Sequence, residues 1–255
     1  MQQPYIVLSN SFMLQHFGNY LLFMSSLVVR GESPRILFNR FIDEAILIGI
    51  NSIFIVAIVS TFIGAVTCVQ TAYNLTSALI PRSTIGFMVR EMTILELAPT
   101  ITSIVLAGKV GSNIAGGLGT MQITEQVDAL EVMGINSASY LVLPKILAAI
   151  FVFPMLVILA MFLSIAGGYV AGTMTGQITP QEYITGIRGD FIPYNIVFAL
   201  IKSVVFAFLI ASISSFRGYN TSGGALEVGE ASTNAVTASV IAILIADFIL
   251  AQVLL

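Results

Sequence analysis

The sequence predicts an all-α integral membrane protein with five transmembrane helices, an N-terminal interfacial helix and a short cytoplasmic helix. Of its 255 residues, 57% are hydrophobic and only 9% are charged, with a mean hydropathy of +0.97. Soluble domains carry about 25% charged residues. The apolar residues gather in five stretches long enough for a helix of about 20 residues to cross the hydrocarbon. Between the second and third stretches lies the most polar and glycine-rich interval, residues 107–134.

Composition also excludes several classes of function. A formal net charge of -3 is not the basic footprint of a nucleic-acid-binding protein. The single cysteine, Cys68, lies in an apolar run and is expected to pack in the core. The single histidine, His16, has no cysteine or histidine companions, so no metal site is predicted. No linker interrupts the apolar series, and residues 1–255 are predicted to form one transmembrane domain.

Residues 10–29 are expected to form a helix lying in the membrane interface. The N-terminus lacks the basic region and small-residue cleavage site of a secretory signal. Apolar residues recur at helical spacing and oppose a polar stripe of Ser11, Gln15, Asn19 and Ser26. The apolar set is Met13, Phe17, Tyr20, Leu21, Met24, Leu27 and Val28. A core helix docked on the bundle would show the same pattern, so both arrangements stay open.

The five predicted spans cover residues 45–70, 85–108, 142–172, 193–215 and 233–253. Ser33 and Pro34 are suited to begin the first helix as N-cap and first-turn proline, and Pro81 is expected to end the turn after the first span. Pro99 should kink the second span, which is interrupted by Arg90, Glu91 and Glu96.

Short motifs outside these spans predict how the helices are connected. Gly168, Gly172 and Gly176 at the end of the third span form a small-residue face for close helix contact. Thr179-Pro180-Gln181-Glu182 combines an N-cap, a first-turn proline and a capping-box glutamate, and predicts a short helix ending near Gly189. Arg217 to Glu230 is expected to be a polar loop.

The distribution of basic residues predicts that the N-terminus is cytoplasmic and the C-terminus is on the opposite side. In that orientation the inner side holds Arg30, Arg35, Arg40, Lys109, Lys145 and Arg217, and the outer side holds only Arg82 and Arg188. The glycine-rich interval then faces the cytoplasm.

The second half of this interval, residues 120–134, predicts a short amphipathic helix. Ile123, Val127 and Leu130 fall on one face, and Gly134 stands where a C-cap glycine would. Gln122, Glu125, Asp128 and Glu131 occupy the other faces. A short acidic helix between two spans could dock a soluble partner, although a simple connection between helices has the same appearance.

Three charged residues fall deep within spans: Glu96, Lys202 and Asp247. Each costs about 2.5–3.5 kcal/mol at a helix centre, so each should face protein or water. An ion-pair lock between helices, a proton relay and a role beside a lipid-headgroup cavity are all compatible with this. Counting residues from the span ends places all three in one layer of the outer half. Because opposite charges at one depth should pair, Lys202 is predicted to contact Asp247, Glu96 or both.

The sequence carries no enzyme signature. It has no GxxxxGK[ST] phosphate-binding loop, no GxSxG motif and no zinc-ligand spacing. The chain is therefore not expected to be an enzyme, and any ATP hydrolysis is expected on a separate subunit.

The stretch GTMQITEQVDALEVMG closely resembles the signature of MlaE-type permeases, the membrane subunits of ABC transporters that work with MCE proteins. The resemblance extends from about residue 62 to the C-terminus. It implies a homodimer that binds phospholipid between its subunits, two ATPase subunits on the cytoplasmic side and an MCE-domain protein on the periplasmic side. It implies no cofactor in this chain, with ATP and Mg on the ATPase.

Carried over by motif, the resemblance also implies site residues. LELAPTITSIVLAGKVGS, ALIKSVVFAF and IADFILAQ supply Glu96, Leu97, Lys202 and Asp247 as substrate-binding residues, together with Asn195, at a position often acidic in similar proteins. The implied ATPase-coupling residues are Gln122, Glu125, Gln126, Asp128 and Glu131. Leu95 stands where some members have an arginine, which argues against a direct headgroup charge contact there.

The resulting hypothesis is a permease subunit of an ATP-driven transporter in the inner membrane of a Gram-negative-type bacterium. It would move phospholipid between inner and outer membranes and maintain outer-membrane lipid asymmetry. The alternative is an ion-coupled secondary transporter using Glu96, Lys202 and Asp247, although such transporters usually show two corresponding halves. A membrane-embedded enzyme and a scaffold that anchors an MCE ring are further classes.

Overall fold

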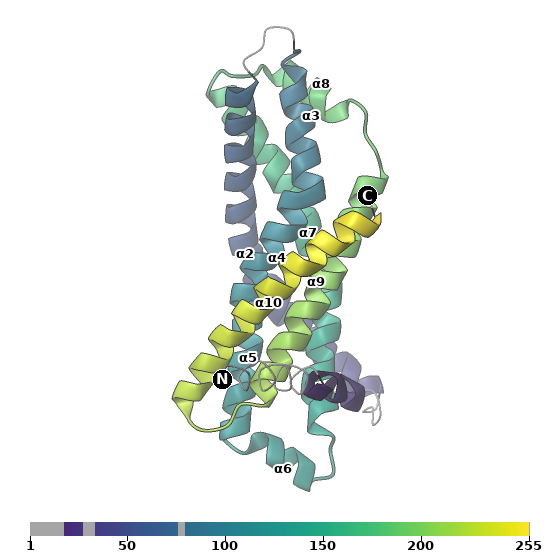
Figure 1. Ribbon diagram of the computed structural model, residues 1–255, viewed down its shortest axis with the longest axis vertical. Coiled ribbons are helices and arrows are strands. Elements are labelled where there is room, and N and C mark those ends of the chain that lie inside the picture. The colour runs from purple at the N-terminus through teal and green to yellow at the C-terminus, as the bar shows by residue number, and fades with distance from the viewer. Residues whose placement is uncertain (1–17, 28–33, 76–79, 255) are drawn as a thin grey trace, which may run out of the picture.

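The computed structural model describes residues 18–27, 34–75 and 80–254 and is entirely helical within them, without a strand (Figure 1). Five helical segments are long and apolar enough to cross a membrane. They are α2 (Pro34–Asn74), the continuous stretch Ser83–Ile123, α7 (Ser137–Met174), α9 (Tyr194–Tyr219) and α10 (Ala225–Leu254). Two short helices, α6 (Gln126–Val132) and α8 (Pro180–Arg188), lie at opposite ends of the bundle. The all-α, five-span prediction is confirmed.

All five long helices extend past their predicted spans, and the second differs most. It continues from Ser83 to Ile123 through α3 (Ser83–Met92), the π-helical η1 (Thr93–Ile101), α4 (Thr102–Leu106), the π-helical η2 (Ala107–Gly111) and α5 (Ser112–Ile123). The glycine-rich interval is thus helix as far as Ile123, although the predicted second span ended at residue 108. Some of its glycines lie close to neighbouring helices: a Cβ on Gly111 would lie 2.9 Å from the Ser214 hydroxyl.

The predicted helix over residues 120–134 is wrong in its boundaries. α5 runs to Ile123, and α6 begins only at Gln126, because Glu125 adopts a left-handed conformation (φ 59°) between them. The end of α6 is as predicted. Gly134 has φ +81°, its N–H donates to the Glu131 carbonyl, and the Ile135 N–H donates to that of Leu130. These two bonds form the C-terminal motif that a left-handed glycine permits.

The connection from α9 to α10 is shorter than predicted, whereas the short helix α8 begins and ends as predicted. α9 continues to Tyr219 and α10 starts at Ala225, so the expected polar loop from Arg217 to Glu230 shrinks to residues 220–224. At the opposite end, α8 has the predicted capping box: Thr179 Oγ1 accepts from the Glu182 N–H, and the Thr179 N–H donates to the Glu182 carboxylate.

α2 and α7 form the most extensive helix pair, and glycines let their backbones touch. A Cβ on Gly64 would lie 1.8 Å from the Ser164 carbonyl oxygen, and one on Gly167 would lie 2.2 Å from that of Thr61. In the predicted small-residue face, Gly168 and Gly172 do make close contacts, with Tyr183 and Cys68. Gly176 does not belong to that face, because it lies after the helix end with φ +69° and nothing near it.

The described part of the N-terminal helix, residues 18–27, lies across the bundle beside α9 (Figure 1). Tyr20 donates to the Ser212 hydroxyl at 2.8 Å, and the Phe23 ring packs against Phe216 and Tyr219. Leu21, on the predicted apolar face, is exposed and does not pack on the bundle. The helix therefore docks on the bundle through Tyr20, Phe23 and Leu27. Residues 10–17, 28 and 29 of the prediction lie outside the described residues, as does His16.

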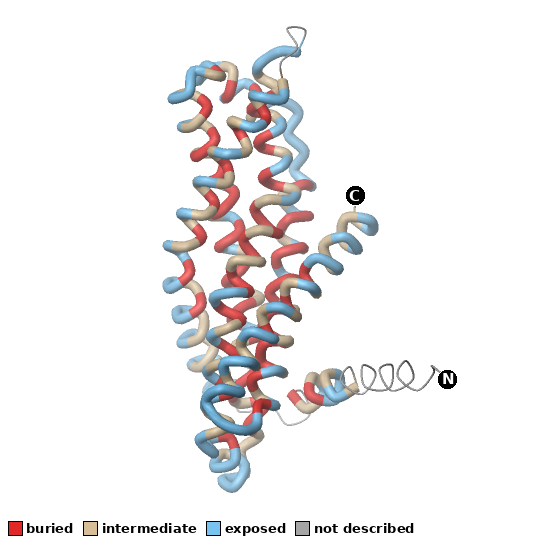
Figure 2. The backbone as a smooth tube through the Cα atoms, turned by 60° about the vertical axis from the view of Figure 1, so that its left-hand side comes forward, coloured by how far each residue is buried: buried red, intermediate tan, exposed pale blue. Residues whose placement is uncertain are grey.

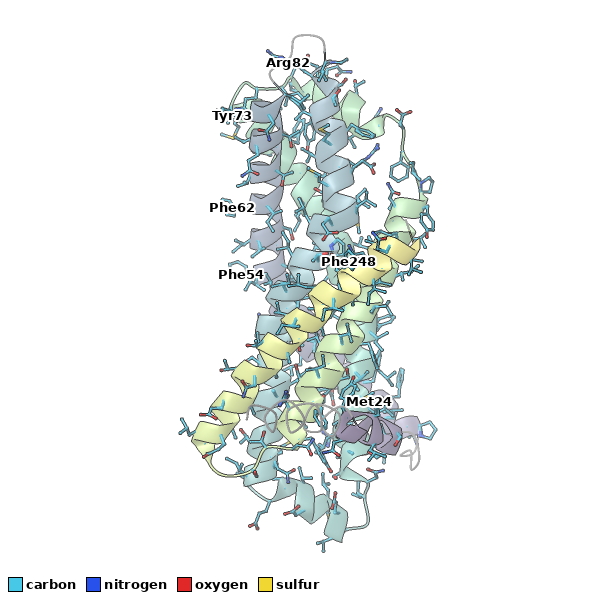
Figure 3. All side chains as sticks on the ribbon, in the orientation of Figure 1. Met24, Phe54, Phe62, Tyr73, Arg82 and Phe248 are labelled. Atoms are coloured by element: carbon cyan, nitrogen blue, oxygen red, sulfur yellow. The ribbon has the colours of Figure 1, made fainter. Side chains whose placement is uncertain are left out.

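Burial separates the bundle interior from its periphery (Figure 2). Phe54, Phe62 and Tyr73 on α2 and Phe248 on α10 are each at least two-thirds exposed (Figure 3). Such large apolar residues on the outside suit contact with lipid or with another membrane subunit. α10 crosses the bundle diagonally and its C-terminal half diverges from it, so little of its apolar stretch is buried.

Candidate functional site

The three deep charges meet in one cluster, the ion triad Glu96–Lys202–Asp247. Lys202 on α9 is fully buried. Its Nζ lies 2.7 Å from Glu96 Oε2 on η1 and 2.5 Å from Asp247 Oδ1 on α10. The predicted pairing of Lys202 is thus confirmed with both carboxylates. One ammonium held between two carboxylates satisfies the requirement that a buried charge be paired, and it ties three spans together.

Local backbone structure explains how Lys202 is held. Nζ also donates to the Leu95 carbonyl at 3.1 Å. In an α-helix that carbonyl would accept from the residue four positions later, which is Pro99 and has no N–H. The proline lies inside the π-helical segment η1, a type of segment often found at functional sites. Lys202 Nζ also lies 5.1 Å from the centre of the Phe198 ring.

The two carboxylates of the triad differ in their exposure to the surroundings. The side chain of Asp247 is only 15% exposed and accepts a hydrogen bond from Thr100 at 3.2 Å, whereas that of Glu96 is 51% exposed. With both carboxylates ionised and Lys202 protonated, the cluster carries a net charge of -1. Glu96 can therefore keep its contact with Lys202 and still offer an oxygen to a molecule outside the bundle.

Asn195, the remaining polar candidate, is not brought to the triad. It lies about two helical turns from Lys202 along α9, and its amide donates to Glu91 at 2.6 Å. Glu91 pairs with the fully buried Arg90 at 2.7 Å. Arg90 in turn donates to the carbonyl of Ile187 in the last turn of α8 and to those of Gly189 and Asp190 after it. The cluster of Arg90, Glu91 and Asn195 therefore anchors the segment between α8 and α9. The last candidate, Leu97, is half-buried and follows Glu96 directly in η1.

The predicted coupling residues lie at the far end of the bundle, and they differ in exposure. Glu125, Gln126, Asp128 and Glu131 are exposed on or beside α6, while Val127 is buried beneath them. Gln122 is only partly exposed, and its side-chain carbonyl is buried without a partner among the described residues. Glu131 accepts hydrogen bonds from Ser137 and Tyr219, which tie α6 to α7 and α9.

Sequence reasoning missed several groups around these clusters. The Leu95 carbonyl and Thr100 complete the triad, and Pro99 was the signal of irregular helix beside Glu96. The role of Arg90 had a weaker signal, since adjacent Arg90 and Glu91 within a span suggest a buried pair but not its partners after α8. Two further side chains, Val132 and Met133, are strongly exposed at the end of α6, at 89% and 65%.

Comparison with known families decides the identity. The profile of the family described as Permease MlaE matches residues 41–253. This chain belongs to the MlaE permease family. A probable ABC transporter permease of Rickettsia bellii is 34% identical over 93% of this chain and 92% of its own length. One of Synechocystis is 35% identical over 82% of this chain and 79% of its own.

A plant protein is similar over a shorter part of its length. Protein TRIGALACTOSYLDIACYLGLYCEROL 1, chloroplastic, of Arabidopsis thaliana is 36% identical over 80% of this chain and 58% of its own length. This MlaE-family chain is therefore a multi-pass membrane permease subunit of the ABC transporter type, a class that associates with ATPase subunits. The ion triad, η1 and α6 all lie within the matched residues.

Proposed function

We propose that this permease moves phospholipid between the inner and outer membranes and that the ion triad forms the headgroup end of its substrate site. The half-exposed Glu96, held by a fully buried Lys202, carries this proposal. A carboxylate held in that way can accept hydrogen bonds from the ammonium or hydroxyl groups of a lipid headgroup. In this arrangement Glu96, Leu97 and Asp247 contact the substrate, the fully buried Lys202 holds the two carboxylates in place, and Asn195 lies about two turns further along α9.

The position of the triad supports a lipid substrate over a small soluble one. Asp247 lies on α10, and the exposed apolar residues Ile245, Phe248 and Ile249 lie next to it along the same helix. A charged group beside apolar surface matches a molecule with a polar head and acyl chains. The name of the Arabidopsis relative contains that of a diacylglycerol lipid, which also favours this class. Such transport would maintain the lipid asymmetry of the outer membrane.

The partners proposed for this function occupy opposite ends of the bundle. Two ATPase subunits, carrying ATP and Mg, dock on α6, where the acidic coupling residues surround the exposed Val132 and Met133. A periplasmic MCE-domain protein meets the end that carries α8, and a second copy of the chain completes the lipid cavity. The N-terminus is then cytoplasmic in the inner membrane of a Gram-negative-type bacterium, and ATP hydrolysis takes place on the partner.

The test is transfer of a fluorescent phospholipid from vesicles containing the permease, purified with its partners, to acceptor vesicles. We expect transfer to require ATP and Glu96→Gln to slow it about tenfold, since one charged hydrogen bond is worth about that factor. Glu230→Gln, which removes the same charge from an exposed site on α10, should leave the rate unchanged. Transfer driven by a proton gradient without ATP would favour the secondary transporter instead. Equal rates for Glu96→Gln and the unchanged protein would remove the triad from the substrate site.

A further inference from the structure

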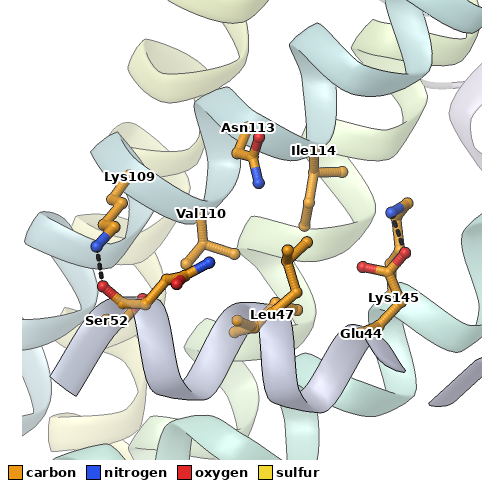
Figure 4. Close-up of a pocket in the computed structure, with 10 residues that line it drawn as sticks. Glu44, Leu47, Ser52, Lys109, Val110, Asn113, Ile114 and Lys145 are labelled. Atoms are coloured by element: carbon orange, nitrogen blue, oxygen red, sulfur yellow. Dashed lines mark hydrogen bonds and ion pairs between the residues drawn. The ribbon is translucent and has the colours of Figure 1, made fainter. Parts of the chain in front are cut away.

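A second polar site lies at the α6 end of the bundle, in a cavity of about 90 Å³ between α2, α7 and the η2–α5 segment (Figure 4). Its polar lining consists of Glu44, Asn51 and Ser52 from α2, Lys109 and Asn113 from η2 and α5, and Lys145 from α7. α2 packs along α7 but only lightly against η2, which leaves the space open. None of these residues belongs to the ion triad.

The cavity has one positive charge in excess. Lys145 forms an ion pair with Glu44. Lys109 donates to the backbone carbonyl of Asn51, and among the described residues no carboxylate lies within salt-bridge distance of it. Two ammonium groups and one carboxylate leave a net charge of +1. A phosphodiester carries a charge of -1 and would neutralise it.

The cavity also holds unused hydrogen-bonding groups. Glu44 Oε2 and the hydroxyl of the fully buried Ser52 are buried without partners among the described residues. Buried polar atoms normally find a partner, so each is a position for a ligand atom. The carboxylate oxygen requires a donor, such as a headgroup hydroxyl or ammonium. Lys109, Lys145 and the Asn113 amide offer donors to phosphate oxygens.

The level of the cavity along the helices matches that of lipid headgroups. Glu44 is the last charged residue of α2 before an uncharged run to Asn74, and Lys145 is the last of α7 before an uncharged run to Met174. The boundary between charged and uncharged helix is where a bilayer places its headgroups. A water molecule needs about 15 Å³ of such volume, so the cavity has room for about six water-sized positions, enough for a phosphate group but not for acyl chains.

We infer that this cavity binds the phosphodiester of a phospholipid in the leaflet next to α6, at a site separate from the ion triad. Lys109 and Lys145 hold the phosphate, Asn113 adds an amide donor, and the Glu44 carboxylate accepts from the alcohol end of the headgroup. The acyl chains remain in the bilayer outside the cavity. This site is independent of the proposed substrate site and does not require the triad to bind lipid.

The absence of tryptophan in the chain provides a direct test. Leu47→Trp places a single fluorescent reporter at the cavity, since Leu47 is one of its lining residues. The full-length variant in a phosphate-free detergent is titrated with phosphatidylglycerol, with diacylglycerol of the same acyl chains and with inorganic phosphate. We expect saturable binding of phosphatidylglycerol, weakened about tenfold by Lys109→Gln and also weakened by Asn113→Ala. Arg188→Gln, an equal loss of charge on the exposed surface of α8, should change it less than twofold.

The outcomes separate the possible ligands and sites. Inorganic phosphate that saturates the reporter as readily as phosphatidylglycerol would assign the site to free phosphate, which retains the phosphate chemistry but overturns the lipid source. An equal response to diacylglycerol, or unchanged binding in both Lys109→Gln and Asn113→Ala, would overturn the proposal. Glu96→Gln, which alters the triad but leaves the Lys202–Asp247 ion pair in place, should leave this titration unchanged, so the result does not depend on whether the triad binds substrate.

Discussion

At the scale of single residues, the central feature is a lysine that is fully buried and yet satisfied. Lys202 donates hydrogen bonds to Glu96 and to the Leu95 carbonyl, and it forms an ion pair with Asp247. An ammonium group alone at this depth would be costly, and two carboxylates without a cation would be worse. The three residues therefore act as a unit, and the loss of one changes the free-energy cost of burying the other two.

This interdependence predicts non-additive mutant effects. Lys202→Ala leaves two buried or half-buried carboxylates without a cation and should destabilise the permease by about 3–5 kcal/mol. Adding Asp247→Ala removes one of those stranded charges, so the double variant should be more stable than the single one. Thermal unfolding of both variants in detergent measures this. If the effects of Lys202→Ala and Asp247→Ala simply add, the three residues do not act as a unit.

The sequence was sufficient to predict the charges of this cluster but not its geometry. Counting residues along three spans placed Glu96, Lys202 and Asp247 at one depth, and opposite charges at one depth pair. The Thr100 hydrogen bond could not be predicted, because it depends on the rotation of η1 about its axis. Asn195 shows the same limit: it lies on the same helix as Lys202 but contacts Glu91 instead.

At the scale of elements, the pairing of α2 with α7 depends on direct contact between backbones. Gly64 faces the Ser164 carbonyl, and Gly167 faces that of Thr61. Helices in a membrane gain little from hydrophobic association and associate through close packing, for which small residues are required. The two glycines thus set the separation of the most extensive helix pair.

Adding one methyl group at this contact should separate the helices. A Cβ at position 64 would overlap the Ser164 backbone, which cannot rotate away as a side chain can, so Gly64→Ala should cost about 1–3 kcal/mol. Gly117→Ala is the matched control, because nothing lies within 4 Å of its Cβ position on α5. It should be neutral or stabilising by up to about 1 kcal/mol. Equal melting temperatures for the two variants would show that the close contact does not limit stability.

The largest error of the sequence-based prediction also concerns an element. Five glycines between positions 108 and 119 suggested a break, because glycine weakens a helix by about 1 kcal/mol relative to alanine. The stretch stays helical because some of those glycines make contacts that only a bare backbone allows, as Gly119 does beside Val228 and Thr221. Such contacts involve residues about one hundred positions away, so local propensity could not reveal them.

At the scale of the whole molecule, one subunit leaves much apolar surface uncovered on α10. Only Ala235, Ser239 and Ile243 of this helix are buried, although it is long and apolar enough to span a membrane. A broad lipid cavity is difficult for five spans to enclose alone. Both facts favour a second copy of the chain beside the first, with the two related by a two-fold axis.

The copy number can be measured directly. Native mass spectrometry of the complex purified in mild detergent should show two permease chains in each complex. If the two permease chains contact each other directly, the dimer should also persist when bound lipid is removed by dilution in detergent. Complexes with a single permease chain under all conditions would contradict the two-fold arrangement.

The unequal lengths of the spans have a consequence for the surrounding bilayer. After Glu44, α2 continues without a charge for 30 residues to Asn74, whereas α9 has 23 residues from Tyr194 to Phe216 before Arg217; at 1.5 Å per residue these correspond to about 45 Å and about 35 Å. At the α8 end, α2, α3 and α7 rise beyond the start of α9 (Figure 1). A bilayer adjusts to such hydrophobic mismatch by thickening or thinning locally. Lipids that border α2 and α7 are therefore stretched relative to those that border α9, and each subunit imposes a gradient of membrane thickness around its own circumference.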